Sequence, residues 1–134
     1  MRINGVKRIK LKKFNNIRGD LLKYISKNDN FFEKFGEVYF TEIKKKPKGW
    51  NYHKYNKCLI AVPYGKVQFT LVDGRKKKTD FNKRLKISIG KKNYFLLIIP
   101  PKVWFSFRSL TNFSLIANLI KTPHSKLEIK KRDI

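Results

Sequence analysis

The sequence predicts an all-β domain built as a sandwich, barrel or jelly roll, and three observations support this prediction. The chain has 134 residues, the size of one domain and long enough to bury a core, so we expect a single domain over residues 1–134. Apolar and polar residues alternate in short runs, which is the period of β-strands. Turn residues separate these runs at near-regular spacing, as they do in sandwiches and barrels.

The predicted strands follow one another along the whole chain, and only the stretch NDNFFEKF indicates a possible helical turn. In order, they cover residues 9–14, 19–25, 35–44, 57–62, 66–74, 84–90, 95–99, 104–107 and 114–120. The clearest is KVQFTLVDG, in which Val67, Phe69 and Leu71 point to one side and the polar residues between them to the other. The other alternating runs place Leu85, Ile87 and Ile89, and more loosely Val38, Phe40 and Ile43, on one face each.

Turn-forming residues lie between the predicted strands. They are Asn28-Asp29-Asn30, Lys46-Pro47-Lys48-Gly49, Pro63-Tyr64-Gly65, Asp73-Gly74, Gly90 and Pro100-Pro101. Pro63 and Pro100 fall at strand ends, where a missing hydrogen-bond donor does little harm. A closed or two-sheet arrangement removes most sheet edges, and its mouth is a natural small-molecule site.

The net charge of +24 has two interpretations. Clustered Lys and Arg side chains neutralise phosphates and so favour binding to them, which would indicate a nucleic-acid-binding protein. Alternatively, the chain is simply rich in lysine, because residues with AT-rich codons are all plentiful and lysine is spread along the whole sequence. Arginine, the better ligand for phosphates and base edges, is scarce. We favour the second interpretation, although a diffuse positive potential would still attract an anionic substrate.

Several features favour a cytoplasmic protein that does not contact a membrane. No apolar run is long enough to span a bilayer, since FLLIIPP has only the length of a strand and ends in prolines. The N-terminus has no apolar stretch of the signal-peptide type. The single Cys58 cannot form an internal disulfide and offers no metal cluster.

Five stretches of the sequence occur in a recognisable order. They are RGDLL, FGEVYFTEIKKKPKGWNYHKY, VPYGKVQFTLVDGR, IIPPKVWFSF and LIANLIKTPHSKLEI. Through them the chain, from about Gly5 to Ile129, resembles the dTDP-4-dehydrorhamnose 3,5-epimerase family and the related dTDP-sugar 3,4-ketoisomerases. The resemblance implies a cupin-like jelly roll (a double-stranded β-helix), usually a homodimer that shares strands between subunits. It also implies isomerisation of a nucleotide-diphospho-sugar in cell-surface polysaccharide synthesis, with no metal or organic cofactor.

In these families a base removes a proton from the carbon next to a sugar ketone, and an acid returns a proton. This chemistry needs a base with a pKa near neutral and a group that stabilises the oxyanion. The family's base is the His of Arg-Gly-x-His, and Asn51 matches that position. The ketoisomerases carry two His one residue apart, which match Asn51 and His53. Residues two apart in a strand share a face, so we expect Asn51 and His53 to point into one cavity, as candidate catalytic residues.

Other positions depart from the family pattern. Phe105 stands where the family has a His after Pro-Pro-Gly, and Asn118 is the best match to the catalytic Tyr. The family's late Asp, which orients the base, has only Asp133 as a weak substitute. The resemblance implies binding of the nucleotide diphosphate by Arg18 and Arg75, with Lys48 in place of an Arg. Trp50, Trp104, Phe105 and Asn118 complete the candidate substrate-binding residues.

Structural interpretations stay open beside the functional ones. His53 can be a packed histidine among Trp50, Tyr52 and Tyr55, and aromatic residues at strand spacing are usually core. His124, after a Thr-Pro turn, is expected at the surface. Three hypotheses follow: an isomerase of a 4-keto-6-deoxy sugar nucleotide, a catalytically lapsed sugar-nucleotide-binding protein, and a basic barrel that binds nucleic acid. The resemblance favours the first and makes nucleic acid an unlikely partner.

Overall fold

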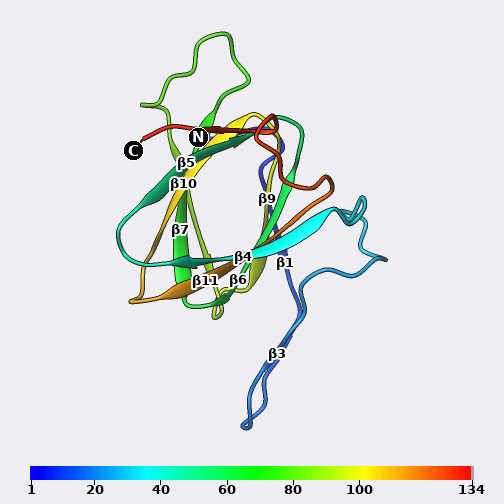
Figure 1. The fold of residues 1–134 in the computed structure, drawn as a ribbon. Helices are drawn as coiled ribbons and strands as arrows, with labels where there is room; N and C mark the ends of the chain where they lie inside the picture. Colours follow the sequence, from blue (N-terminus) through cyan, green and yellow to red (C-terminus); the bar gives the residue numbers. More distant parts are fainter. Residues whose placement is uncertain (134) are drawn as a thin grey trace.

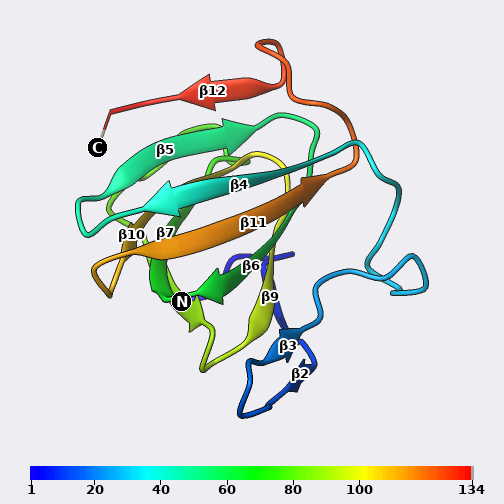
Figure 2. The same cartoon turned by 60° about the horizontal axis from the view of Figure 1, so that its bottom comes forward.

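The computed structural model describes residues 1–133, and Ile134, the last residue of the predicted domain, lies outside the described part. Within the described residues, twelve β-strands form two five-stranded antiparallel sheets and one two-stranded hairpin (Figures 1 and 2). The first sheet has the order β1 (Lys7–Lys10), β9 (Phe95–Ile99), β6 (Cys58–Tyr64), β11 (Ser114–Ile120) and β4 (Glu37–Ile43). The second has the order β12 (Ile129–Lys131), β5 (Lys48–His53), β10 (Val103–Ser109), β7 (Lys66–Asp73) and β8 (Leu85–Gly90).

The eight strands β4 to β11 have jelly-roll connectivity, because successive strands cross between the two sheets, except for the β7–β8 hairpin, and strands distant in the sequence lie side by side. The last of them, β11, pairs with the first, β4, and β5 pairs with β10. The strands β1 and β12 each add one edge strand to a sheet. The prediction of an all-β, cupin-like jelly roll is therefore confirmed.

In the second sheet, the apolar faces that alternation predicts for β7 and β8 pack in the core between the two sheets. The alternating apolar residues of β7 and β8 pair directly: Val67 with Ile89, Phe69 with Ile87, and Leu71 with Leu85. Phe69, Leu71 and Val67 are completely buried. Burying such side chains contributes about 1.5–3 kcal/mol each to folding. The strict period of two in the sequence therefore reflects one face packed in the core.

The prediction for β4 is wrong in its first half. Val38 and Phe40 are 40% and 65% exposed, whereas Tyr39 and Thr41 face the space between the sheets. Only Ile43, at the end of β4, is buried as predicted. The physical reason is that this part of β4 forms the wall of a cavity, so polar side chains face inwards and apolar ones outwards.

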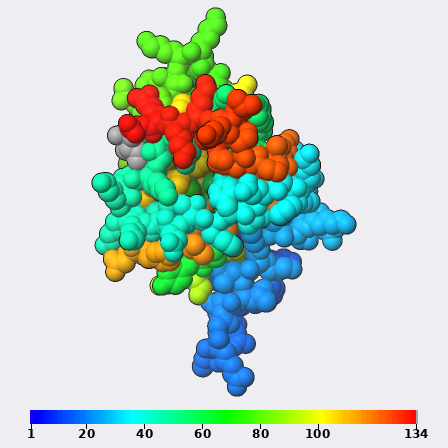
Figure 3. Space-filling model, viewed as in Figure 1, coloured from blue at the N-terminus to red at the C-terminus, as the bar shows by residue number. Residues whose placement is uncertain are grey.

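The N-terminal region is less regular than predicted. Residues 9–14 and 19–25 were expected as strands, but they contain only the end of β1 and the short pair β2 (Lys13–Phe14) and β3 (Leu21–Leu22). This β2–β3 hairpin projects from the body of the molecule (Figures 2 and 3). The stretch NDNFFEKF contains turns but no helix. Within residues 1–133, no helix has the length and apolar character needed to cross a membrane.

Candidate active site

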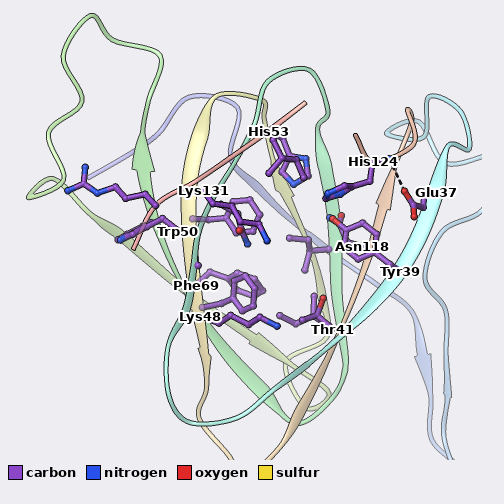
Figure 4. Close-up of a pocket in the computed structure, with 18 of the residues that line it drawn as sticks. Glu37, Tyr39, Thr41, Lys48, Trp50, His53, Phe69, Asn118, His124 and Lys131 are labelled. Carbon is purple, nitrogen blue, oxygen red and sulfur yellow. Dashed lines mark hydrogen bonds between the residues drawn. The ribbon is translucent and has the colours of Figure 1, made fainter. Parts of the chain in front are cut away.

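A cavity of about 810 Å³ opens between the two sheets, with β4, β6 and β11 on one side and β5, β7 and β10 on the other (Figure 4). Its floor is apolar, whereas its walls carry side chains that can donate or accept hydrogen bonds. The polar and charged residues in its lining are Glu37, Tyr39, Thr41, Lys48, Asn51, His53, Asn118, His124, Lys131, Arg132 and Asp133. A concave site with a few convergent polar groups is the usual form of a small-molecule site.

Gly49 allows β5 to enter the sheet close to β10. Its φ is 113°, which L-residues with a side chain rarely adopt. A Cβ atom at this position would lie 2.9 Å from the carbonyl oxygen of Phe105. After this close approach, the strand alternation turns Asn51 and His53 towards the cavity, whereas Tyr52 does not line it.

His53 is held by a buried carboxylate. Its Nδ1 atom lies 2.6 Å from Oε1 of Glu128, and the side chains are 4% and 1% exposed. Strand pairing creates this contact, because Ile129 in β12 pairs with His53 in β5. The other Glu128 oxygen accepts a hydrogen bond from the Tyr55 amide, and Oε1 also accepts one from Asn56 Nδ2. A carboxylate that accepts several hydrogen bonds in a buried position stays ionised and fixed.

The geometry determines which nitrogen of His53 can act as a base. Nδ1–H donates to Glu128, which leaves the lone pair on Nε2. The Phe105 ring stacks on the imidazole at 6.0 Å with an interplanar angle of 8°. Burial lowers the pKa of His53 below its usual value, although the Glu128 carboxylate opposes this effect. Burial raises the pKa of Glu128, but hydrogen bonds from the Tyr55 amide, His53 and Asn56 together bring that pKa below its usual value.

A phenol and an amide lie on the wall opposite His53 (Figure 4). Asn118 Nδ2 in β11 donates a 2.8 Å hydrogen bond to the Tyr39 hydroxyl in the neighbouring strand β4. Burial raises the pKa of Tyr39, so its hydroxyl remains protonated at neutral pH. The Oδ1 atom of Asn118 is buried and has no hydrogen-bond partner among residues 1–133. A neutral proton donor thus faces the cavity close to an unpaired acceptor.

Comparison with known proteins shows the family to which this chain belongs. No family model matches the sequence. The chain is 31% identical over 111 residues to the spore coat polysaccharide biosynthesis protein SpsL of Bacillus subtilis, which covers 81% of this chain and 72% of SpsL. A crystal structure of a dTDP-sugar isomerase from Desulfovibrio desulfuricans is 30% identical, with a TM-score of 0.90 over 98% of this chain and 85% of that one. The chain belongs to the family of dTDP-sugar isomerases and epimerases.

A more distantly similar structure has the same fold. The 3,4-ketoisomerase QdtA from Thermoanaerobacterium thermosaccharolyticum is 20% identical, with a TM-score of 0.79 over 98% of this chain and 90% of QdtA. That structure is of a mutant in complex with TDP-4-keto-6-deoxyglucose. At this identity the likeness concerns the fold alone.

The structure brings part of the predicted site together in the cavity. Lys48, Asn51, His53, Phe105 and Asn118 all line it. Trp50 also borders the cavity, but its ring packs against Phe81 with centroids 5.6 Å apart. Asn51 and His53 lie on the same wall, as their spacing in a strand predicts. Their catalytic roles stay predictions.

Three predicted substrate-binding residues lie elsewhere. Arg18 is exposed between β2 and β3 in the projecting hairpin, away from the cavity of its own chain. Arg75 lies at the start of the loop after β7, where it makes a two-pronged contact with Asp73. Trp104 belongs to the outward face of β10 and packs on Tyr52 at 4.8 Å, because alternation turns it away from Phe105. The fold thus holds Arg18, Arg75 and Trp104 away from the cavity, although the resemblance assigned all three to the substrate-binding site.

Two residues of the candidate site escaped the sequence analysis, and a third was expected only at the surface. The carboxylate that binds His53 is Glu128. Asp133, which the sequence analysis matched to the acid that orients the base, only lines the cavity. The signal for Glu128 was an acidic residue between Leu127 and Ile129 in a mostly basic segment. Tyr39 was missed because the inward face of β4 was assigned to its apolar residues. His124 is exposed, as expected, but it also lines the cavity. Among residues 1–133, no three His, Cys, Asp or Glu side chains gather as metal ligands would.

Proposed function

We propose that this protein is an isomerase that acts on a dTDP-linked 4-keto-6-deoxy sugar in cell-surface polysaccharide biosynthesis. The observation that carries the proposal is the buried His53–Glu128 pair in the wall of a cavity large enough for a sugar nucleotide. A histidine oriented by a carboxylate is a recurring arrangement for general bases. Membership of the family of dTDP-sugar isomerases and epimerases supports the choice of substrate class.

In the proposed reaction, Nε2 of His53 removes a proton from the carbon next to the ketone. The electron pair of the broken C–H bond moves to the ketone oxygen and forms an enediolate. The lowered pKa of His53 keeps the imidazole neutral and ready to accept this proton at neutral pH. The protonated Tyr39 hydroxyl and the Asn51 amide stabilise the oxyanion by hydrogen bonds. The enediolate carbon then takes up a proton and the ketone forms again, while His53 passes its own proton to solvent and becomes neutral.

The diphosphate needs positive charge near the cavity. Lys48, Lys131 and Arg132 line the cavity and can supply this charge within one chain. Lys48 lacks the planar fork of an arginine, whereas Arg132 retains it. We therefore assign diphosphate binding to these three residues.

We propose that the protein is a homodimer in which the β2–β3 hairpin of each chain contacts the other. The support is the exposed apolar surface of the projecting hairpin, where Phe14, Ile17 and Leu21 are 56%, 102% and 58% exposed. Such a dimer would offer Arg18 to the partner's cavity, which explains its distance from the cavity of its own chain. Analytical ultracentrifugation should give a dimer mass that Ile17→Lys reduces to the monomer mass. A monomeric wild-type protein would contradict this arrangement.

The proposed location is the cytoplasm. Its support is Cys58, a buried and unpaired thiol of the kind that persists in reducing compartments.

The proposed activity is tested by incubating the protein with dTDP-4-keto-6-deoxyglucose in D₂O and following the sugar by NMR. We expect wild type to exchange the proton next to the ketone and to form an isomeric product. His53→Ala should lose both, while Lys86→Ala, on an exposed position of β8, should retain both. If wild type neither exchanges nor isomerises any dTDP- or UDP-linked 4-keto sugar, the proposal fails.

A second candidate function is a binding protein that has lost catalysis, because Asn51 and Asn118 occupy positions where the family has a base and an acid. This candidate predicts that dTDP raises the Tm while no proton exchange takes place. The experiment above therefore separates the two functions.

A further inference from the structure

The two histidines of the chain come together in one cavity. His53 comes from β5 in the second sheet, and His124 follows β11 of the first sheet, 71 residues later by number. Figure 4 shows the His124 ring beside Asn118 and Tyr39, turned towards His53. Both residues therefore line the same cavity from opposite sheets.

The backbone of His124 holds its side chain in place. The amide N–H of His124 donates a 2.8 Å hydrogen bond to Oε1 of Glu37 in β4. The imidazole meets the Tyr39 ring edge-on, with centroids 6.4 Å apart and an interplanar angle of 82°. No hydrogen bond within residues 1–133 engages the imidazole nitrogens. The ring is thus positioned without using the atoms that could move a proton.

We propose that His124 is a second catalytic acid–base residue, which returns a proton to the sugar from the side opposite His53. This inference rests on the proposed isomerase function. The two imidazoles extend from different walls, so a sugar carbon between them can lose a proton to one ring and gain a proton from the other. Two such groups on opposite faces of the carbon allow its inversion without reorientation of the enediolate.

Every proton and electron pair in the proposed step is accounted for. His53 Nε2 takes the proton from carbon and becomes an imidazolium, and the C–H electron pair forms the enediolate. The enediolate carbon then takes a proton from the His124 imidazolium, which becomes neutral, and the ketone forms again. Exchange with water returns both histidines to their starting states. Glu37 is a positioning residue in this scheme, since it binds only the backbone of His124.

The assignment is tested with His124→Asn in the D₂O experiment with dTDP-4-keto-6-deoxyglucose. Any residue other than proline keeps the amide that binds Glu37, so we expect the Tm of this variant to match wild type. Exchange of the substrate proton through His53 should persist, whereas product formation should fall about 10²-fold or more. Lys126→Ala, an exposed position in the same segment, is the matched control and should leave both rates unchanged.

The other outcomes separate this inference from the proposed function. If His124→Asn forms product at the wild-type rate, His124 is not the proton donor and only this inference fails. If His124→Asn loses exchange together with product while its Tm is unchanged, the division of roles between the histidines is wrong. If wild type shows no exchange, the proposed function fails, and this inference fails with it.

Discussion

The Nδ1 atom of His53 and the Oε1 atom of Glu128 lie 2.6 Å apart in the buried wall of the cavity. The contact joins the last residue of β5 to the residue just before β12, and the pairing of these two strands fixes it. It makes Nδ1 the donor and Nε2 the acceptor, and it places a negative charge where an imidazolium would form. The proposed base and the residue that orients it therefore depend on a single strand pair.

Replacing Glu128 with Gln should reduce activity far more than stability. The variant keeps the size of the side chain but removes the charge that selects the tautomer of His53 and stabilises its protonated form. We expect proton exchange to fall about 10²–10⁴-fold. Solvent deuterium exchange and a thermal melt on the same sample measure both effects. Activity within twofold of wild type would contradict the role given to Glu128.

The stability of the protein should fall on mild acidification because of His53. Burial holds its folded-state pKa below the ordinary value of 6.5, so the unfolded chain binds more protons just below that pH. This contribution is full above pH 6.5 and is lost as the pH falls from there to the folded-state pKa. The lowered pKa of Glu128 adds a separate loss below its ordinary value of 4.5.

Urea unfolding midpoints measured between about pH 5 and pH 8 test this prediction. The wild-type midpoint should decrease below pH 6.5, and His53→Gln should remove most of this decrease. An equal slope in the two proteins would show that another group is responsible.

Replacing Lys102 with Gly should stabilise the protein. Lys102 has a φ of 65°, a left-handed conformation in the turn between β9 and β10. This conformation costs a residue with a side chain about 1–2 kcal/mol, and the greater chain entropy of glycine offsets part of the gain. The Lys102 amide donates a 2.7 Å hydrogen bond to the His53 carbonyl, which glycine retains. We expect the free energy of unfolding to rise by about 0.5–1 kcal/mol.

Chemical denaturation measures this gain, with Lys86→Gly as the matched control. Lys86 is exposed in the strand β8, where glycine should instead destabilise the protein by about 0.5–1 kcal/mol. Destabilisation by both substitutions would contradict the strain assigned to Lys102.

Replacing Gly49 with Ala should destabilise the protein and disturb the cavity. The new Cβ would lie 2.9 Å from the Phe105 carbonyl oxygen, in addition to the strain of a φ of 113°. We expect a loss of about 1–3 kcal/mol. Gly19→Ala is the control, since Gly19 also has a positive φ, 130°, but a Cβ there meets nothing within 4 Å. Equal losses from the two variants would show that contact with β10 contributes nothing.

The sequence predicted the fold where one face of a strand is packed and failed where a strand borders the cavity. The alternation of Val67, Phe69 and Leu71 identifies a core face because these side chains are all buried. The same rule misassigns β4, since a cavity wall reverses the expected distribution: Phe40 faces outwards and Tyr39 inwards. Periodicity indicates that two faces differ, but not which one borders an internal space.

The candidate site was predictable only where its residues lie near one another in the sequence. Asn51 and His53 share a strand, so their common face follows from spacing alone. Glu128 reaches His53 through the register of β12, which no local pattern reveals. Arg18 and Arg75 matched the family's motifs, but those motifs carry no information about the hairpin and the loop that hold them away from the cavity.

Both tryptophans of the chain pack against one aromatic side chain, Phe81. Trp50 and Trp104 each contact Phe81, with centroids 5.6 and 5.7 Å away, and Phe81 comes from the loop between β7 and β8. The guanidinium of Arg84 lies over Trp50 at 5.4 Å. Intrinsic ultraviolet fluorescence therefore reports whether this loop is seated on the sheet. A change in emission on addition of a nucleotide sugar would be the signature of a loop that responds to occupancy of the cavity behind it.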